Sequence, residues 1–269
     1  MLTHVEAVSY LSYKSTGKTA PLVLECEDSS GETFEVVTKL KGHGQVFPGV
    51  FVCEAFASMV AAFLGLPVPK PFVVKITDQF ARSAIGEVDS ETLNASLGLN
   101  FGTQHWASGY AIWSKRGAVS KDMFQLASSI FAFDGLIQNP DRRDSNPNLV
   151  TKGSDYLLFD HDSAFSHFHD IFVTLPPWEE DSVEFLKEHV LRNGLRSQLY
   201  RSGKKVNMLD LDELVEKFRR LDRQTLDSFS TAIPSEWDSP TLNAEGIVEY
   251  LLSCVEHLDD IVLLINKEA

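Results

Sequence analysis

Short runs that alternate apolar and polar residues occupy most of the first hundred residues, and alternation with a period of two is typical of β-strands. The runs are rich in valine, phenylalanine and threonine and are separated by turn-forming residues. They predict strands at residues 4–13, 21–28, 33–41, 72–76, 80–85 and 97–103. The short turns between the first three runs indicate an antiparallel meander.

Apolar residues at helical spacing interrupt this pattern once and then dominate the second half of the chain. The first such segment covers residues 52–64, and Gly65 after it is a suitable helix stop. Further helices are predicted at residues 121–138, 179–193, 208–220, 222–232 and 243–266, with Asp222 and Asn243 as N-caps. A buried strand is expected at 156–159. The pattern therefore predicts an α+β fold, with a strand-rich N-terminal half, a helical C-terminal half and a ligand cleft between them.

Composition narrows the function classes. The 269 residues are 43% hydrophobic and 23% charged, as in ordinary globular proteins. The formal net charge of -14 argues against direct nucleic-acid binding and against an anionic lipid surface as partner. No apolar run approaches the ~20 residues of a membrane span. Three scattered cysteines and the lack of a visible secretory signal predict a cytoplasmic protein with reduced thiols.

The densest polar stretch, residues 138–148, carries the most specific chemistry. Asp141 is followed five residues later by Asn146, and Asp160 comes directly after the apolar run at 156–159. An acid that orients a hydroxyl, and an amide and a second acid that hold a metal on a nucleotide, are the parts of a magnesium-dependent phosphoryl transferase. We therefore predict Asp141 as the catalytic residue and Asn146 and Asp160 as metal ligands. Asn148 competes with Asn146 for its role, and Asp162 competes with Asp160.

The nucleotide phosphates require cationic partners as well. Lys39 lies on the third predicted strand, and Lys41 shares its face and is a competitor. Glu54, in the following helix, can pair with Lys39 and hold it toward the phosphates. Gly17 and Lys18 lie in a turn-rich loop that could cover phosphates with backbone N–H groups, although the spacing of a Walker A motif is absent.

The order of these residues resembles the HipA-like kinases and, more distantly, the type II phosphatidylinositol 4-kinases. The residues that carry the resemblance are Lys39, Glu54, Gly65-Leu66-Pro67-Val68-Pro69, Asn139-Pro140-Asp141-Arg142-Arg143, Asn146-Pro147-Asn148-Leu149 and Phe159-Asp160-His161. The resemblance implies a two-lobed protein-kinase-like fold, with an N-lobe at residues 1–110 and a C-lobe at 111–269. It also implies that ATP and Mg²⁺ bind between the lobes, and that the γ-phosphoryl group passes to a hydroxyl of a protein Ser or Thr. The protein acceptor is unidentified.

Two other hypotheses remain open at this stage. Asp162 stands where related kinases often have glycine, which favours a nucleotide-binding regulatory module without turnover. A metal-dependent phosphohydrolase would use Asp160 and Asp162 with nearby histidines, which are His161, His167 and His169.

Overall fold

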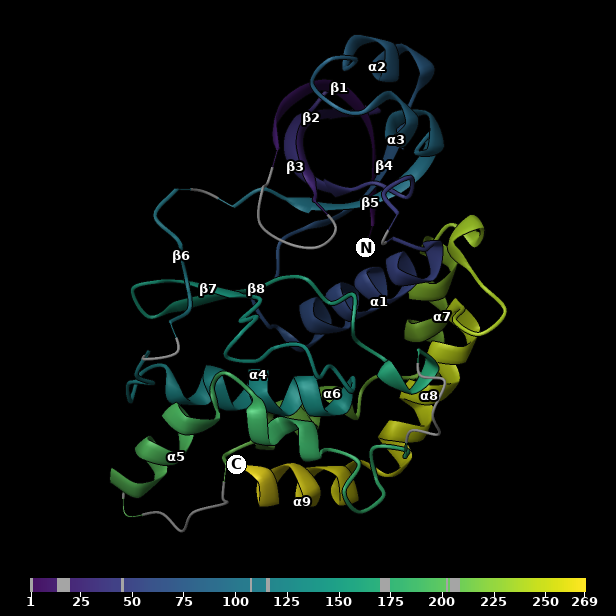
Figure 1. Cartoon of the computed structure of the whole chain (residues 1–269). Helices are drawn as coiled ribbons and strands as arrows, with labels where there is room; N and C mark the ends of the chain where they lie inside the picture. The colour runs from purple at the N-terminus through teal and green to yellow at the C-terminus, as the bar shows by residue number, and fades with distance from the viewer. Residues whose placement is uncertain are drawn as a thin grey trace.

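The computed structural model describes residues 2–13, 20–44, 46–106, 108–114, 117–169, 175–201, 203 and 209–269. A sheet-rich part and a mainly helical part lie at opposite ends of the molecule (Figure 1). The strands are β1 (Thr3–Tyr13), β2 (Leu22–Asp28), β3 (Thr33–Lys39), β4 (Pro71–Ile76), β5 (Gly98–Gln104), β6 (Ala111–Ile112), β7 (Leu149–Lys152) and β8 (Asp155–Leu158). The α-helices are α1 (Pro48–Leu64), α2 (Asp78–Ser83), α3 (Ser90–Ala95), α4 (Phe124–Leu136), α5 (Arg192–Arg201), α6 (Asp212–Phe218), α7 (Arg223–Ala232), α8 (Ala244–Glu256) and α9 (Leu258–Glu268). Short 3-10 helices are η1 (Ser166–Phe168), η2 (Glu184–Glu188) and η3 (Ser235–Trp237).

The first five strands form a closed barrel in the order β1-β2-β3-β5-β4, visible end-on in Figure 1. The predicted antiparallel meander is confirmed for β1 to β3, but β1 also pairs in parallel with β4 and closes the sheet, which the sequence did not predict. Two register shifts in β1 bend that strand, as closure of a small barrel requires. Gly102 of β5 leaves room inside, because a Cβ there would lie 2.5 Å from Cγ1 of Val36.

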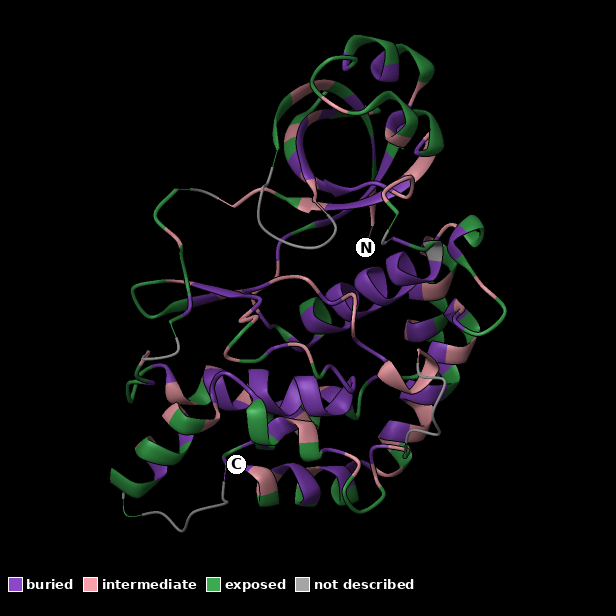
Figure 2. Cartoon of the chain, viewed as in Figure 1, coloured by how far each residue is buried: buried purple, intermediate pink, exposed green. Residues whose placement is uncertain are grey.

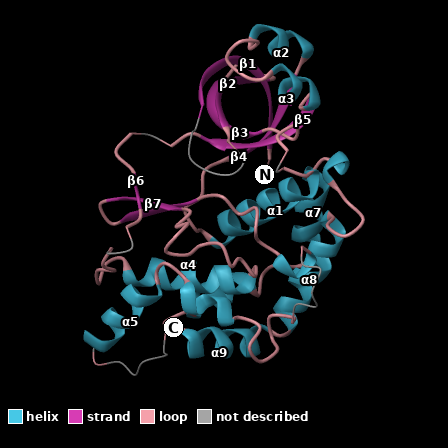
Figure 3. Cartoon of the chain, in the orientation of Figure 1, coloured by secondary structure: helices cyan, strands magenta, loops and turns pink. Residues whose placement is uncertain are grey.

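Two predicted elements are wrong. The segment 80–85 belongs to helix α2 and its end, because the side chain of Thr77 accepts a hydrogen bond from the N–H of Phe80 and starts a helix there. The predicted helix at 179–193 is a series of turns with the short η2, and a helix begins only at Arg192. Asp181 has a left-handed φ of +67°, which interrupts the helical path. Helix α5, which begins at Arg192, is a separate element (Figure 3).

Helix α1 lies between the barrel and the other helices and is buried along most of its length (Figure 2). Gly65 ends it in the left-handed conformation, with its N–H directed at the carbonyls of Ala61 and Ala62, as predicted. The ring centroid of Phe51 in α1 lies 5.3 Å from that of Trp237 and 6.3 Å from that of Phe101 in β5. The side chains of α1 thus share one hydrophobic core with the helical part, whereas the barrel interior forms a second, smaller core.

In the helical part, α4 packs against α5 and α9. Asp222 and Asn243 cap α7 and α8 as predicted, by accepting hydrogen bonds from Thr225 and Gly246. The helix predicted at 243–266 is divided at His257 into α8 and α9. The small sheet β6-β7-β8 lies between α4 and the barrel and delivers the chain to Asp160 (Figure 1). In the described ranges, no helix combines the length and the apolar character that crossing a membrane would need.

Candidate active site

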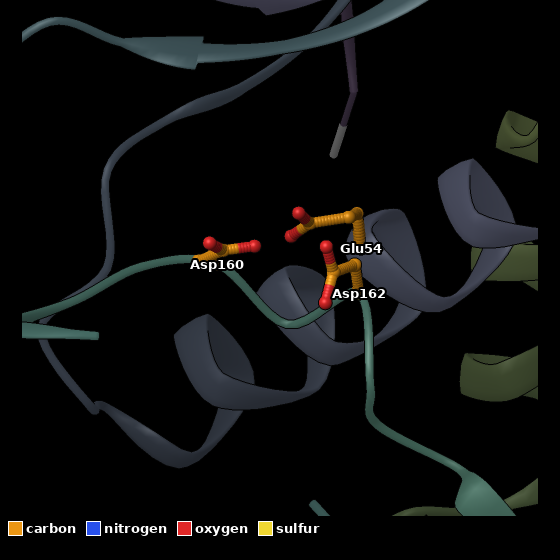
Figure 4. A group of neighbouring side chains, drawn as sticks. All are labelled: Glu54, Asp160 and Asp162. Carbon is orange, nitrogen blue, oxygen red and sulfur yellow. The ribbon is translucent and has the colours of Figure 1, made fainter. Parts of the chain in front are cut away.

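The ammonium group of Lys39 is the centre of the site. Lys39 ends β3, and its Nζ lies 2.6 Å from Oε1 of Glu54, 2.5 Å from Oδ1 of Asp160 and 3.0 Å from Oδ2 of Asp162. The expected pairing of Lys39 with Glu54 is therefore present. Figure 4 shows the three carboxylates turned toward one another, Glu54 from α1 and the two aspartates from the segment after β8. Their oxygens lie within 4.8 Å of one another, the spacing of a metal site.

One ammonium does not balance three carboxylates. Burial is the largest influence on Glu54; together with the charges of Asp160 and Asp162, and against the attraction of Lys39, it raises the pKa of Glu54 to about 7. Burial works against the ammonium of Lys39, yet the surrounding carboxylates hold the pKa of that lysine well above its usual value. Burial opposes ionisation of Asp162 as well, but Lys39 and the hydrogen bonds to Asp162 lower its pKa. With all four groups ionised the cluster keeps two surplus negative charges, which a divalent cation would neutralise.

The backbone brings Asp160 and Glu54 together. Asp160 has a left-handed φ of +58°, a conformation that costs a residue other than glycine roughly 1–2 kcal/mol. The next residue, His161, donates its backbone N–H to Oε2 of Glu54 at 2.8 Å. Glu54 therefore binds Lys39 with one oxygen and the segment after Asp160 with the other. Backbone strain of this kind is typical of functional sites.

Asp141 lies in the loop between α4 and β7, where two asparagines contact it. Nδ2 of Asn146 donates a hydrogen bond to Oδ2 of Asp141 at 2.6 Å. Nδ2 of Asn148 lies 3.5 Å from the same oxygen and 3.4 Å from the carbonyl of Asp160, and it links the loop to the carboxylate cluster. Burial is the main influence that raises the pKa of Asp141, and the charges of Asp162 and Asp160 add to it. A carboxylate with a raised pKa is a better proton acceptor.

The remaining predicted residues have varied outcomes. Lys41 lies outside the cluster, with Nζ 3.4 Å from Oε1 of Glu236. Gly17 and Lys18 lie outside the described residues. Among the part of the chain that is described, the group with metal-ligand spacing contains no histidine. His161 is buried beside Phe133, and His169 contacts Sγ of Cys53 and the carbonyl of Ala164.

A buried ionic network under the loop was not found from the sequence. Asp134 of α4 accepts hydrogen bonds from Arg142 (2.6 Å, from Nε), Asn139 (2.9 Å) and His189 (3.0 Å). The arginine and its hydrogen bonds hold the pKa of Asp134 well below its usual value, although burial acts in the opposite direction. One signal was available, because Asp134 is the acidic residue within an otherwise apolar helical stretch.

Comparison with known proteins assigns this chain to a family. The model of the HipA-like kinase family matches residues 8–258, so the resemblance predicted from the sequence is confirmed. A search of curated proteins finds no match. The crystal structure of the Helicobacter pylori proinflammatory kinase CtkA is similar over 99% of this chain and 97% of its own, with 12% identity and a TM-score of 0.50, which shows a shared fold.

A second structure, the Golgi casein kinase with Mn/ADP bound, aligns over 98% of this chain and 73% of its own, with 13% identity and a TM-score of 0.44. That similarity is too low to support an inference. The mixed sheet-and-helix class predicted from the sequence is confirmed by the structure itself and by the fold shared with CtkA.

Proposed function

Because the chain belongs to the HipA-like kinase family, we propose that it transfers the γ-phosphoryl group of ATP to a Ser or Thr hydroxyl of a protein. One observation carries the proposal. Carboxylates from α1 and from the segment after β8 converge on the ammonium of Lys39 in β3. Asn148 joins this cluster to Asp141. Phosphoryl transfer depends mainly on positioning and on neutralised charge, and this arrangement supplies groups for both.

The proposed nucleotide site lies beside Lys39. Its ammonium would bind the phosphates, and Glu54 would keep it in place when the aspartates turn to other partners. Trp106 and Phe159 form an aromatic pair with ring centroids 4.9 Å apart. Phe159 directly precedes Asp160, so the pair would offer an apolar surface for a base. Gly17 and Lys18 remain proposed phosphate contacts.

The carboxylate cluster fits a divalent cation. Asp160 would be the principal protein ligand, with Asp162 beside it and the side-chain oxygen of Asn146 as a further donor. These are hard oxygen donors of the kind that Mg²⁺ prefers, and the two surplus negative charges match its charge. Bound Mg²⁺ would neutralise charge on the phosphates during transfer.

Asp141 would accept the proton of the attacking hydroxyl. The raised pKa of its carboxylate favours this role, and Asn146 fixes one oxygen while Arg143 lies 3.5 Å from the other. The acceptor would approach from the solvent side, since the Asp141 side chain is 22% exposed.

The proposed nucleotide site lies between two lobes. We assign residues 1–110 to an N-lobe that contains the barrel, and 111–269 to a helical C-lobe that contains Asp141 and the metal-binding aspartates. Helix α1 is counted with the first lobe by sequence, although its side chains pack into the core of the second.

The test is phosphate incorporation from labelled ATP with Mg²⁺, including autophosphorylation, followed by identification of the phosphorylated residue type. Asp141→Asn removes the proton acceptor and keeps the size of the side chain, so transfer should fall by about 10²-fold or more. Asp155→Asn, at the exposed first residue of β8, is the matched control and should retain transfer. Equal transfer by wild type and Asp141→Asn would refute the assignment.

A nucleotide-binding module without turnover is the second candidate. The contact of Asp162 with Lys39 favours it, because Asp162 competes with phosphate for the ammonium. ATP-dependent thermal stabilisation of wild type, without transfer to itself or to a broad panel of proteins, would support this candidate over the first.

A further inference from the structure

Arg142 follows Asp141 in sequence, but its side chain is fully buried, whereas that of Asp141 is 22% exposed. We infer that Arg142 is a positioning residue that fixes the proposed catalytic loop relative to the segment carrying Asp160. The inference rests on the function proposed above and adds to it a group that contacts neither nucleotide nor acceptor.

The guanidinium of Arg142 joins two segments through their backbone carbonyls. Nη1 donates to the carbonyl of Asn148, at the end of the loop, and to the carbonyl of Phe159 at 3.4 Å. Phe159 directly precedes Asp160, and Arg142 directly follows Asp141. One rigid planar group is thus bonded to both sides of the gap between the proposed proton acceptor and the proposed metal ligand.

Asp134 holds the other edge of the guanidinium. Its Oδ2 accepts from Nε at 2.6 Å, and its Oδ1 accepts from Nη2 at 3.4 Å. Asn139 donates to the same carboxylate at 2.9 Å, so the chain entering the loop is tied to it as well. Asp134 lies in the C-terminal half of α4, where residues 130–136 are all buried, so the guanidinium has little freedom to turn.

His189 completes the network as a neutral donor. Its Nδ1 accepts the backbone N–H of Leu191 at 3.2 Å, so the ring proton is on Nε2, which donates to Oδ2 of Asp134 at 3.0 Å. Burial lowers the pKa of His189, which agrees with a neutral ring. The carbonyl of Arg142 accepts the N–H of Val190 at 3.1 Å, which fixes the arginine backbone against the same segment.

A lysine in place of Arg142 keeps the charge but lacks the planar fork of donors. In Arg142→Lys the contacts to Asn148 and Phe159 cannot be kept together with both contacts to Asp134. We expect kcat to fall about tenfold or more, while KM for ATP changes less than about threefold. Binding is spared because Lys39 and Glu54 are untouched, whereas the spacing of Asp141 from Asp160 affects the transfer step.

A matched control separates this role from general stability. Leu226→Ala empties a fully buried position in α7, remote from the loop, and lowers the melting temperature. It should leave kcat within about twofold. If Arg142→Lys keeps kcat within that range, or if its loss equals that of Leu226→Ala, the inference is overturned.

If Arg142→Lys does not fold, His189→Gln decides, because it weakens the hold on Asp134 without removing a charge. A fall in kcat of about threefold or more at constant KM supports the inference, and an unchanged kcat overturns it.

A structural measurement keeps the inference distinct from the proposed function. Without nucleotide, the side-chain amide NMR signals of Asn146 and Asn148 should shift in Arg142→Lys or, if that variant does not fold, in His189→Gln. The same signals should keep their positions in Leu226→Ala. If wild type transfers no phosphate, the proposed function fails and this measurement alone decides the positioning role. Unshifted signals then overturn it.

Discussion

Replacing Lys39 with methionine removes the ammonium that holds three carboxylates together and keeps most of the side-chain volume. Removing one partner of a buried ion pair typically costs about 3–5 kcal/mol. The side chains of Asp160 and Asp162 are 29% and 24% exposed, so water compensates part of their loss. Glu54 is almost fully buried and dominates the effect. We therefore expect Lys39→Met to lower the free energy of unfolding by about 3 kcal/mol above neutral pH.

The loss should depend on pH in a defined direction. The pKa of Glu54 is about 7 with Lys39 present, and it rises when the ammonium is removed. Between these two pKa values Glu54 is protonated in the folded variant and ionised in folded wild type, whereas in both unfolded chains it titrates alike. Raising the pH through this window therefore weakens the variant more than wild type, by at most about 1.4 kcal/mol per pH unit.

Urea unfolding of wild type and variant at about pH 6 and about pH 8.5 measures both quantities. Lys41→Met is the matched control, because Lys41 contacts the 48% exposed Glu236 and should contribute only about 0–1 kcal/mol. A loss below about 1 kcal/mol for Lys39→Met, or an equal loss at both pH values, would refute the assignment of Lys39 as the counter-ion of a buried Glu54.

Two further predictions concern the same fold. Glu54→Gln should flatten the pH dependence of stability. Because the pKa of Glu54 is raised in the folded protein, wild type loses up to about 3 kcal/mol of its free energy of unfolding as pH rises from 4.5 through about 7. Urea titrations that give parallel pH curves for both proteins would contradict this. Gly102→Ala should lower the free energy of unfolding by about 1–3 kcal/mol, because the new methyl group would lie 2.5 Å from Val36 and 2.9 Å from Val74 inside the barrel; thermal unfolding measures the loss, and an unchanged melting temperature would show that the barrel interior has room to spare.

The element types with clear periodicity could be predicted from the sequence, because they depend on local patterns. The strands β1 to β5 and helices α1, α4, α7 and α8 occur close to the expected positions. Closure of the barrel could not be predicted, since pairing of β1 with β4 depends on two segments about seventy residues apart. Helix α2 was not predicted because the apolar positions at 80–85 resemble those of a strand, whereas the helix depends on the side chain of Thr77 as its N-cap.

The candidate site followed from spacing in one part and not in another. Asp141, Asn146 and Asp160 stand out because their order along the chain matches a known chemistry. In the structure Asp160 contacts the ammonium of Lys39, Asn146 contacts Asp141, and Asn148 links Asp141 to the carbonyl of Asp160. Asp134 and His189 carry no such signal. His189 reaches Asp134 only through the tertiary fold, and a lone histidine between Glu188 and Val190 has no distinguishing pattern. The metal and nucleotide roles of the predicted residues stay predictions.

Because α1 packs into the core of the helical part, the two partners of the Lys39–Glu54 pair belong to different structural units. Glu54 is carried by a helix whose side chains lie in the same core as the helices of the C-terminal half, whereas Lys39 is carried by a strand of the closed barrel. A hinge motion of the barrel against the helical body would therefore stretch this ion pair directly, without any helix having to rotate. The Lys39–Glu54 distance therefore depends directly on how the barrel and the helical body are oriented. A fluorescence or spin-label distance measured between the barrel and the helical body would report that orientation.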